Sequence, residues 1–290
     1  MAELISPSLQ AQIIEQLGWT PSSWRKVEGG YTPAARFVVE SGLASAFVKV
    51  ATNPVTAAHM RREIVAYGAI DSALRPRLHG ACADGDQPFL IIEDLSAATW
   101  PPPWTDARVQ AALDTINRLH SRPASLKPFS EVHGFERPGW EMVAANPSAF
   151  LSVGLAAAEW LDRALPALLE AEAACQTAGD AAVHFDIRSD NMCFVDGRAV
   201  LIDWGEACLA NPKLDLGAWL PSLAYEGGPS PSTILPNEPE VAAWLSGYFA
   251  ARAGLAPIPS APFVRRVQKQ QLSSALPWVC AELGLGDPLA

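Results

Sequence analysis

The sequence has few charged residues for its length, and it lacks the long apolar runs of membrane proteins. Of its 290 residues, 18% are charged, and 21 basic against 31 acidic residues give a formal net charge of −10. Proteins that track nucleic-acid phosphates need a basic surface, so this balance argues against a nucleic-acid partner. No stretch approaches the roughly 18 apolar residues of a membrane-spanning helix, and no signal peptide is recognisable. We therefore expect a cytoplasmic protein without membrane contact.

The five cysteines are widely spaced and form no CxxC pair. A disulfide framework or a zinc cluster is therefore not predicted, which fits a reducing compartment. The P-loop, GxSxG and HExxH motifs are also missing, which argues against P-loop kinases, serine hydrolases of the α/β type and zinc peptidases. Hydrophobic residues make up 49% of the chain, enough for a sizeable core in two domains or one domain of two lobes.

Hydrophobic periodicity divides the chain into a strand-rich first third and a mainly helical remainder. Strands are predicted over 36–40, 46–50 and within 87–95, and one β-rich insertion over 182–203. Helices are predicted over 6–18, 56–70, 105–119, 155–176 with an interruption near Pro166, 238–253 and 262–283. A lobe boundary is predicted just before the Trp-Pro-Pro-Pro-Trp run at 100–104, because this run continues neither helix nor sheet. The pattern is α+β, with lobes over 1–94 and 95–290.

The β-rich insertion contains the side chains that suggest chemistry. Two apolar strands are joined by Asp196-Gly197, a strong signal for a β-hairpin. Asn191 stands at the entry of this hairpin and Asp203 at its exit, so an amide and a carboxylate meet at one end of the ribbon. Asp186 lies five residues before Asn191, on the loop that leads into the hairpin.

Amide and carboxylate oxygens without histidine or cysteine are ligands for a hard cation such as Mg²⁺, which binds together with substrate phosphates. Asn191 and Asp203 are therefore predicted to be metal ligands. Asp186 is predicted to be the base for a hydroxyl nucleophile. Arg188 either neutralises a transferring phosphoryl group or pairs with Asp190 on the surface.

With His184, Asp186 and Asn191 in an HxDxxxxN pattern and Ile202-Asp203-Trp204-Gly205 after it, the segment resembles the aminoglycoside phosphotransferase family. These are small-molecule kinases similar in fold to protein kinases, so the resemblance implies a bilobal fold with an N-terminal antiparallel sheet lobe and a larger helical lobe. The family usually has glycine after the histidine, and this chain has Phe185. Asp215, after Asn211-Pro212, matches the residue that is implied to hold the catalytic loop.

The same resemblance extends to the N-terminal lobe. It implies that Lys49 contacts the phosphates of ATP or GTP and that Glu63, on the following helix, is its ion-pair partner. The phosphate-covering loop is implied to contain four consecutive residues, Gly29, Gly30, Tyr31 and Thr32. The hinge at Ile92-Glu93-Asp94-Leu95 is implied to hold the nucleobase through backbone groups, with Glu93 and Leu95 as candidate contacts.

The implied activity is Mg²⁺-dependent phosphoryl transfer from a nucleotide to a hydroxyl of an aminoglycoside-type antibiotic, an antibiotic-inactivating reaction. The acidic side chains of Glu206, Glu226 and Glu282 support a cationic acceptor, and Trp278 either lines the acceptor pocket or packs in the core. Kinases acting on choline, fructosamine or sugars are alternatives. So are a non-catalytic nucleotide-binding protein and a metal-dependent hydrolase. The sequence indicates no oligomeric state.

Overall fold

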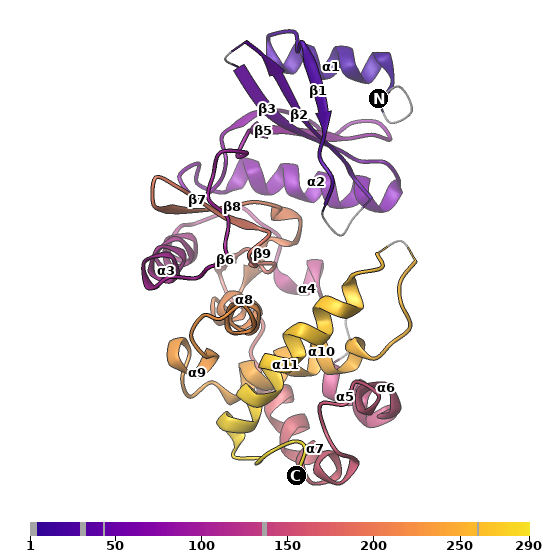
Figure 1. Cartoon of the computed structure of the whole chain (residues 1–290), viewed down its shortest axis with the longest axis vertical. Coiled ribbons are helices and arrows are strands. Elements are labelled where there is room, and N and C mark those ends of the chain that lie inside the picture. The colour runs from indigo at the N-terminus through magenta and orange to yellow at the C-terminus, as the bar shows by residue number, and fades with distance from the viewer. Residues whose placement is uncertain (1–4, 30–32, 43, 135–137, 260) are drawn as a thin grey trace.

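The computed structural model describes residues 5–29, 33–42, 44–134, 138–259 and 261–290. Figure 1 shows a sheet with two helices at one end of an elongated molecule and a bundle of helices at the other. A short β-hairpin lies between these two parts. Among the helices of the described residues, none combines the length and the apolar character needed to cross a membrane.

The N-terminal lobe contains a five-stranded antiparallel sheet in the order β1-β2-β3-β5-β4. The predicted hairpin over 36–40 and 46–50 is confirmed, with β2 and β3 in register from Ala35 opposite Val50 to Ser41 opposite Ala44. The strands are β1 (Ser23–Lys26), β2 (Ala35–Ser41), β3 (Ala44–Val50), β4 (Leu78–Cys82) and β5 (Phe89–Glu93).

The two faces of the sheet bury different sets of side chains because successive residues of a strand point to opposite faces. One face carries Val48 and Ile91, which pack on Leu9 and Ile13 of helix α1 (Pro7–Leu17). The residues between them in the strands point to the opposite face, where helix α2 (Pro54–Ala69) and the second lobe lie. Lys49, next to Val48, therefore points toward α2 and the second lobe.

Helix α2 has a well-defined start that sets the position of its side chains. The Asn53 side chain accepts from the backbone N of Thr56 at 2.9 Å, and Thr56 Oγ1 accepts from the backbone N of Asn53 at 3.1 Å. Pro54 occupies the first helical position, where a missing N–H costs nothing. This reciprocal cap satisfies two backbone donors that the helix leaves unpaired.

The C-terminal lobe is mainly helical, as predicted. The helices are α3 (Asp106–Ser121), α4 (Phe129–Val132), α5 (Gly139–Ala145), α6 (Ser148–Leu151), α7 (Ala158–Ala174), α8 (Lys213–Tyr225), α9 (Pro231–Ile234), α10 (Pro239–Ala253) and α11 (Val264–Leu283). The predicted interruption near Pro166 is wrong, because α7 runs through this proline. One proline removes a single helix hydrogen bond. Buried residues on both sides of it, Ala164 and Leu168, keep the helix packed.

The β-rich insertion forms two small ribbons at the junction of the lobes. Strand β7 (Met192–Val195) pairs with β8 (Arg198–Leu201), and β6 (Ala181–Val183) pairs with β9 (Cys208–Ala210). The β7–β8 hairpin is tied to the interlobe linker by two backbone hydrogen bonds between Thr99 and Phe194, of 3.1 and 2.8 Å. Its backbone at Leu201 also donates to Leu74 at 3.1 Å. The loop that carries Asp186 and Asn191 is thereby positioned against the N-terminal lobe.

Candidate active site

A buried lysine connects the two lobes. Lys49 Nζ on β3 lies 2.7 Å from Glu63 Oε2 on α2 and 3.0 Å from Asp203 Oδ1, which follows β8. Lys49 is 6% exposed and Glu63 is 2% exposed, so this pairing is strongly shielded from water. The ion pair implied for Lys49 and Glu63 is present, and it reaches the proposed metal ligand as well.

The charges of this trio stabilise one another. Burial favours the neutral amine, but the carboxylates of Asp203 and Glu63 outweigh it and raise the pKa of Lys49. Burial likewise opposes ionisation of Asp203, yet the Lys49 ammonium holds the pKa of this carboxyl well below its usual range. The lysine is therefore a fixed positive charge at the junction of the lobes.

Three side chains near this lysine, His59, Glu63 and Asp203, have potential ligand atoms within 4.8 Å of one another. This set is not a separate metal site, because the Lys49 ammonium already lies between the two carboxylates. The Lys49 ammonium is the cation that the carboxylates of Glu63 and Asp203 share.

The catalytic loop is held from below by Asp215. Its carboxylate accepts hydrogen bonds from the backbone N of His184 at 2.9 Å and of Phe185 at 2.6 Å, and lies 2.9 Å from His120 Nε2. Asp215 is fully buried. The role that the resemblance implied for it is visible in these contacts. His120, which no motif indicated, completes the support.

His184 positions the loop through hydrogen bonds of both ring nitrogens. Its Nε2 donates to the carbonyl of Ile202 at 2.9 Å, and its Nδ1 accepts from the backbone N of Asp186 at 3.2 Å. Burial lowers the pKa of His184, which keeps the ring neutral and suited to this donor–acceptor pattern. The ring thus joins the loop before the hairpin to the strand end that precedes Asp203.

The Asp186 carboxylate lies between an amide and a guanidinium. Asn191 Nδ2 donates to Asp186 Oδ2 and to the Asp186 carbonyl, each at 2.8 Å, and Arg188 Nη1 lies 3.0 Å from Asp186 Oδ1. Burial raises the pKa of Asp186 to about 7, although Arg188 opposes the shift. Arg188 also contacts Asp190 at 3.0 Å, so the predicted pairing with Asp190 is present, and contact with a phosphoryl group stays a prediction.

The two ends of the hairpin lie side by side, as the turn predicted. The backbone N of Ile202 donates to the carbonyl of Asn191 at 3.0 Å, and Asp203 is the next residue along the chain. Because Asn191 Nδ2 donates to Asp186, the amide oxygen is the atom that can ligate a cation. An amide oxygen together with the carboxylate of Asp203 is a donor set that fits Mg²⁺.

Helix α2 clamps the segment that follows Asp203. Arg62 Nε donates to the Gly205 carbonyl at 2.9 Å, and His59 Nε2 lies 3.0 Å from Glu206 Oε1. A Cβ atom at Gly205 would fall 2.0 Å from His59 Cε1, so only glycine fits beneath this ring. The sequence analysis missed His59 and Arg62. The spacing of His59 four residues before Glu63, on the same helical face, is the signal that could have indicated the first.

The acidic side chains offered for a cationic acceptor each have partners. Glu206 binds His59 and Arg62, and Glu226 accepts from Ser189 at 2.5 Å and from Trp104 at 2.8 Å. Glu282 accepts from Trp278 at 3.2 Å and from the backbone N of Glu238, at the start of α10. Trp278 is 2% exposed, so its packing role is the one that the structure supports. Neither Trp278 nor Glu282 is brought to the cluster around Asp186.

The predicted nucleotide loop and hinge are only partly described. Gly29 has φ +118°, a conformation that suits glycine, whereas Gly30, Tyr31 and Thr32 lie outside the described residues. At the hinge, the backbone N of Glu93 donates to the Arg77 carbonyl at 2.8 Å. A nucleobase would therefore use other backbone groups of the hinge, toward Leu95.

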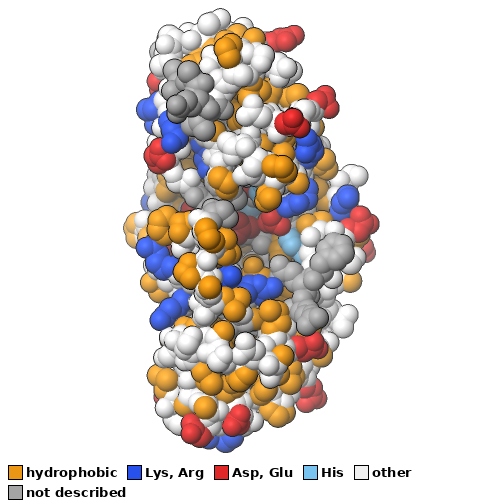
Figure 2. Space-filling view, turned by 90° about the vertical axis from the view of Figure 1, so that its right-hand side faces the viewer, with side chains coloured by type: hydrophobic (Ala, Val, Ile, Leu, Met, Phe, Trp, Pro, Cys, Tyr) orange, Lys and Arg blue, Asp and Glu red, His pale blue; other side chains and the backbone are white. Residues whose placement is uncertain are grey.

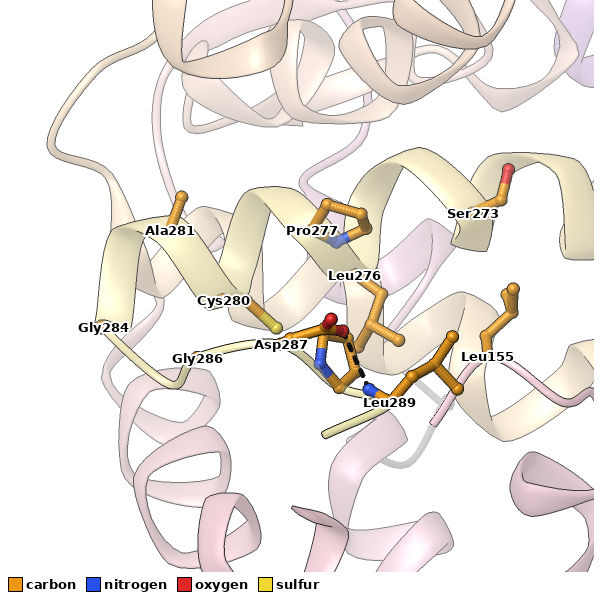
Figure 3. Close-up of a pocket in the computed structure, with 11 residues that line it drawn as sticks. Leu155, Ser273, Leu276, Pro277, Cys280, Ala281, Gly284, Gly286, Asp287 and Leu289 are labelled. Atoms are coloured by element: carbon orange, nitrogen blue, oxygen red, sulfur yellow. Dashed lines mark hydrogen bonds between the residues drawn. The ribbon is translucent and has the colours of Figure 1, made fainter. Parts of the chain in front are cut away.

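The recess between the lobes has a different lining from the cavity at the end of α11. In Figure 2 the surface is hollowed at mid-height, with acidic side chains and a histidine visible in the recess. The cavity in Figure 3, of about 630 Å³, lies at the end of α11 and has a mainly apolar lining that includes Leu155, Leu276 and Cys280. Burial raises the pKa of Cys280 to about 11, so its thiol is a poor nucleophile. None of Lys49, Asp186 and Asp203 lines this cavity.

Solved structures of small-molecule kinases share this fold. A thermostable mutant of the aminoglycoside phosphotransferase APH(4)-Ia, in complex with ADP and hygromycin B, has a TM-score of 0.57 at 14% identity, covering 96% of this chain and 99% of that one. A choline/ethanolamine kinase family protein from Mesorhizobium loti has a TM-score of 0.55 at 16% identity, covering 95% and 98%. A putative fructosamine-3-kinase from Haemophilus somnus has a TM-score of 0.53 at 13% identity, covering 93% and 98%.

These identities are low, so the structural likeness shows the fold alone and confirms the protein-kinase-like, two-lobed α+β class. No curated protein matches the sequence. The sequence model of the phosphotransferase enzyme family matches residues 23–258, which include both the lysine of β3 and the catalytic hairpin. The chain therefore belongs to the phosphotransferase enzyme family.

Proposed function

We propose that this protein transfers the γ-phosphoryl group of ATP or GTP to a hydroxyl group of a small molecule, with Mg²⁺ as cofactor. The observation that carries the proposal is the convergence of Lys49, Asp186 and Asp203 at the junction of the lobes, from three separate segments of the chain. Family membership supports the same reaction type. In such a reaction positioning and electrostatics supply most of the rate.

Asp186 would be the base. Its carboxylate is oriented by the Asn191 amide, and burial raises its pKa to about 7, which suits a group that takes a proton near neutral pH. The acceptor hydroxyl loses its proton to this carboxylate as the oxygen–phosphorus bond forms. The bond between the γ-phosphorus and the bridging oxygen breaks, and the nucleoside diphosphate leaves with that electron pair.

Lys49 and Arg188 would hold the phosphates from two sides. Lys49 is fixed by Glu63 and Asp203, so its ammonium is already oriented toward the recess before a nucleotide binds. Arg188 is 3.0 Å from the Asp186 carboxylate, so its guanidinium would lie close to the transferring group. Mg²⁺ held by Asn191 and Asp203 would neutralise the charge of the β- and γ-phosphates.

The acceptor class is a separate question. An aminoglycoside-type antibiotic is one candidate class because APH(4)-Ia structures, several of them with hygromycin B, are among the similar folds. The similar choline/ethanolamine kinase family protein and the putative fructosamine kinase keep two further acceptor classes in consideration.

The experiment that tests this function compares Asp186→Asn with Asp196→Asn. Asp196 is an exposed residue of the hairpin turn with φ +49°, a position that asparagine accepts well, so it is a matched control. Nucleotide consumption and the mass of the product are measured with a panel of hydroxylated acceptors. We expect Asp186→Asn to lose at least a hundred-fold in kcat and the control to retain wild-type turnover. Equal turnover in wild type and Asp186→Asn would refute the role of Asp186.

A further inference from the structure

Four aromatic side chains form a cluster beside the proposed base, and they bear on the acceptor of the proposed reaction. We call Phe129, His133, Phe185 and Trp244 the aromatic cluster. Phe185 is its centre, with ring centroids 5.3 Å from Phe129, 4.6 Å from His133 and 5.9 Å from Trp244. The rings come from the catalytic loop, from α4 and the residue after it, and from α10.

The backbone of Phe185 has a conformation that glycine adopts most easily. Its φ is +62°, which is strained for a bulky side chain. The strain is maintained because the Asp215 carboxylate accepts from the backbone N of both His184 and Phe185. An aromatic ring is therefore present where the local backbone would favour no side chain at all. Phenylalanine therefore does not favour this backbone conformation, and what it adds at this position is its ring.

The aromatic cluster borders both halves of the proposed site. Phe185 directly precedes Asp186, and His133 Nε2 donates to the carbonyl of Glu206, three residues after Asp203, at 3.0 Å. Phe185, His133 and Trp244 are partly exposed, whereas Phe129 is buried beneath them. An acceptor hydroxyl must reach the Asp186 carboxylate, so the remainder of the acceptor passes next to these partly exposed rings.

The carboxylates close to this position are already neutralised or hydrogen bonded. Glu206 lies against His59 and Arg62, Glu226 accepts from Ser189 and Trp104, and Asp190 pairs with Arg188. A polycationic acceptor would have to compete with these partners for each carboxylate. These carboxylates are therefore less available to a cationic acceptor than their number suggests.

Resting on the proposed function, we infer that the acceptor carries an aromatic or other flat apolar ring close to the hydroxyl that is phosphorylated. The rings of the aromatic cluster meet Phe185 at interplanar angles of 87°, 53° and 54°. Such edge-to-face and tilted packing fills the space between the rings and leaves no cage for a quaternary ammonium group. An apolar ring can extend the same packing. Phe185 is accordingly a specificity-determining residue.

The test uses pairs of alcohols that differ only in an aromatic ring, such as 2-phenylethanol with 2-cyclohexylethanol and phenyl glucoside with methyl glucoside, together with kanamycin and choline. The wild type is compared with Phe185→Leu, Phe185→Tyr and Phe185→Gly, since glycine fits the positive φ without strain. Trp24→Leu, which removes a partly exposed ring from the outer core of the N-terminal sheet, is the control. Thermal unfolding checks the fold of each variant.

We expect the aromatic member of each pair to have the higher kcat/KM. Phe185→Leu and Phe185→Gly should raise its KM by about two- to twelve-fold, the range of an aromatic contact, with Phe185→Tyr and Trp24→Leu near wild type. Preference for kanamycin or choline, or acceptor KM values unchanged in Phe185→Leu, would overturn the inference while leaving phosphoryl transfer intact. Absence of acceptor-dependent transfer in the wild type would instead overturn the proposed function and this inference with it.

Discussion

Replacing Asp215 by alanine tests whether this buried carboxylate holds the catalytic loop. It accepts from two backbone donors, those of His184 and Phe185, and His184 is fully buried. A buried donor left without a partner costs about 1–3 kcal/mol, so two of them cost about 2–6 kcal/mol. Since a protein of this kind is stable by about 5–15 kcal/mol, Asp215→Ala should lose a large fraction of its free energy of unfolding.

Urea denaturation at 25 °C measures this loss. Asp215→Asn retains one acceptor oxygen and should lose about half as much free energy of unfolding, which keeps the variant folded for kinetics. Its kcat should fall while its nucleotide affinity stays near wild type, because Lys49 and Glu63 do not contact Asp215 in the pairing described above. Asp162→Ala, on the exposed side of α7, is the control and should change stability by less than about 0.5 kcal/mol. A loss under 1 kcal/mol in Asp215→Ala would refute the reasoning.

Two further predictions concern Gly205 and Glu172. In Gly205→Ala the added methyl group should collide with His59 and lower the free energy of unfolding by about 1–3 kcal/mol. Adding His59→Ala to this variant should restore part of the loss. A double variant no more stable than Gly205→Ala would contradict the clamp. Burial raises the pKa of Glu172 from its ordinary 4.5 to about 7, so the stability linked to its protonation is present below pH 4.5 and is lost as the pH rises through 7. Between pH 5 and 8 the wild type should therefore lose about 3 kcal/mol relative to Glu172→Gln in urea denaturation, and a difference that does not vary with pH would contradict this.

Local signals in the sequence predicted the parts of the fold that local physics determines. The Asp196-Gly197 turn predicted the hairpin and hence the meeting of Asn191 with Asp203. The helix predicted over 105–119 starts at a capping residue, Thr105, whose side chain accepts from the backbone N of Arg108. These features depend on neighbours in the chain, so the sequence contains them directly.

Other features depend on partners far apart in the chain. The short helices α4, α5 and α6 have no side-chain caps and were not predicted. The contact between Arg62 and Glu206 joins residues 144 positions apart, and no periodicity reveals it. For the same reason Glu206 and Glu282 were interpreted as carboxylates available to a cationic acceptor. In the structure Glu206 pairs with His59, and Glu282 accepts from Trp278.

The most direct test of the account is the Mg²⁺ dependence of nucleotide binding. Isothermal titration with AMP-PNP, with and without Mg²⁺, is carried out on the wild type and on Asp203→Asn, with Asp196→Asn as the control. If Asn191 and Asp203 hold the ion beside the triphosphate, Mg²⁺ should increase wild-type and control affinity at least ten-fold, about 1.4 kcal/mol, and Asp203→Asn should lose most of this gain. Equal affinity with and without Mg²⁺ in the wild type, or an undiminished Mg²⁺ effect in Asp203→Asn, would contradict the account.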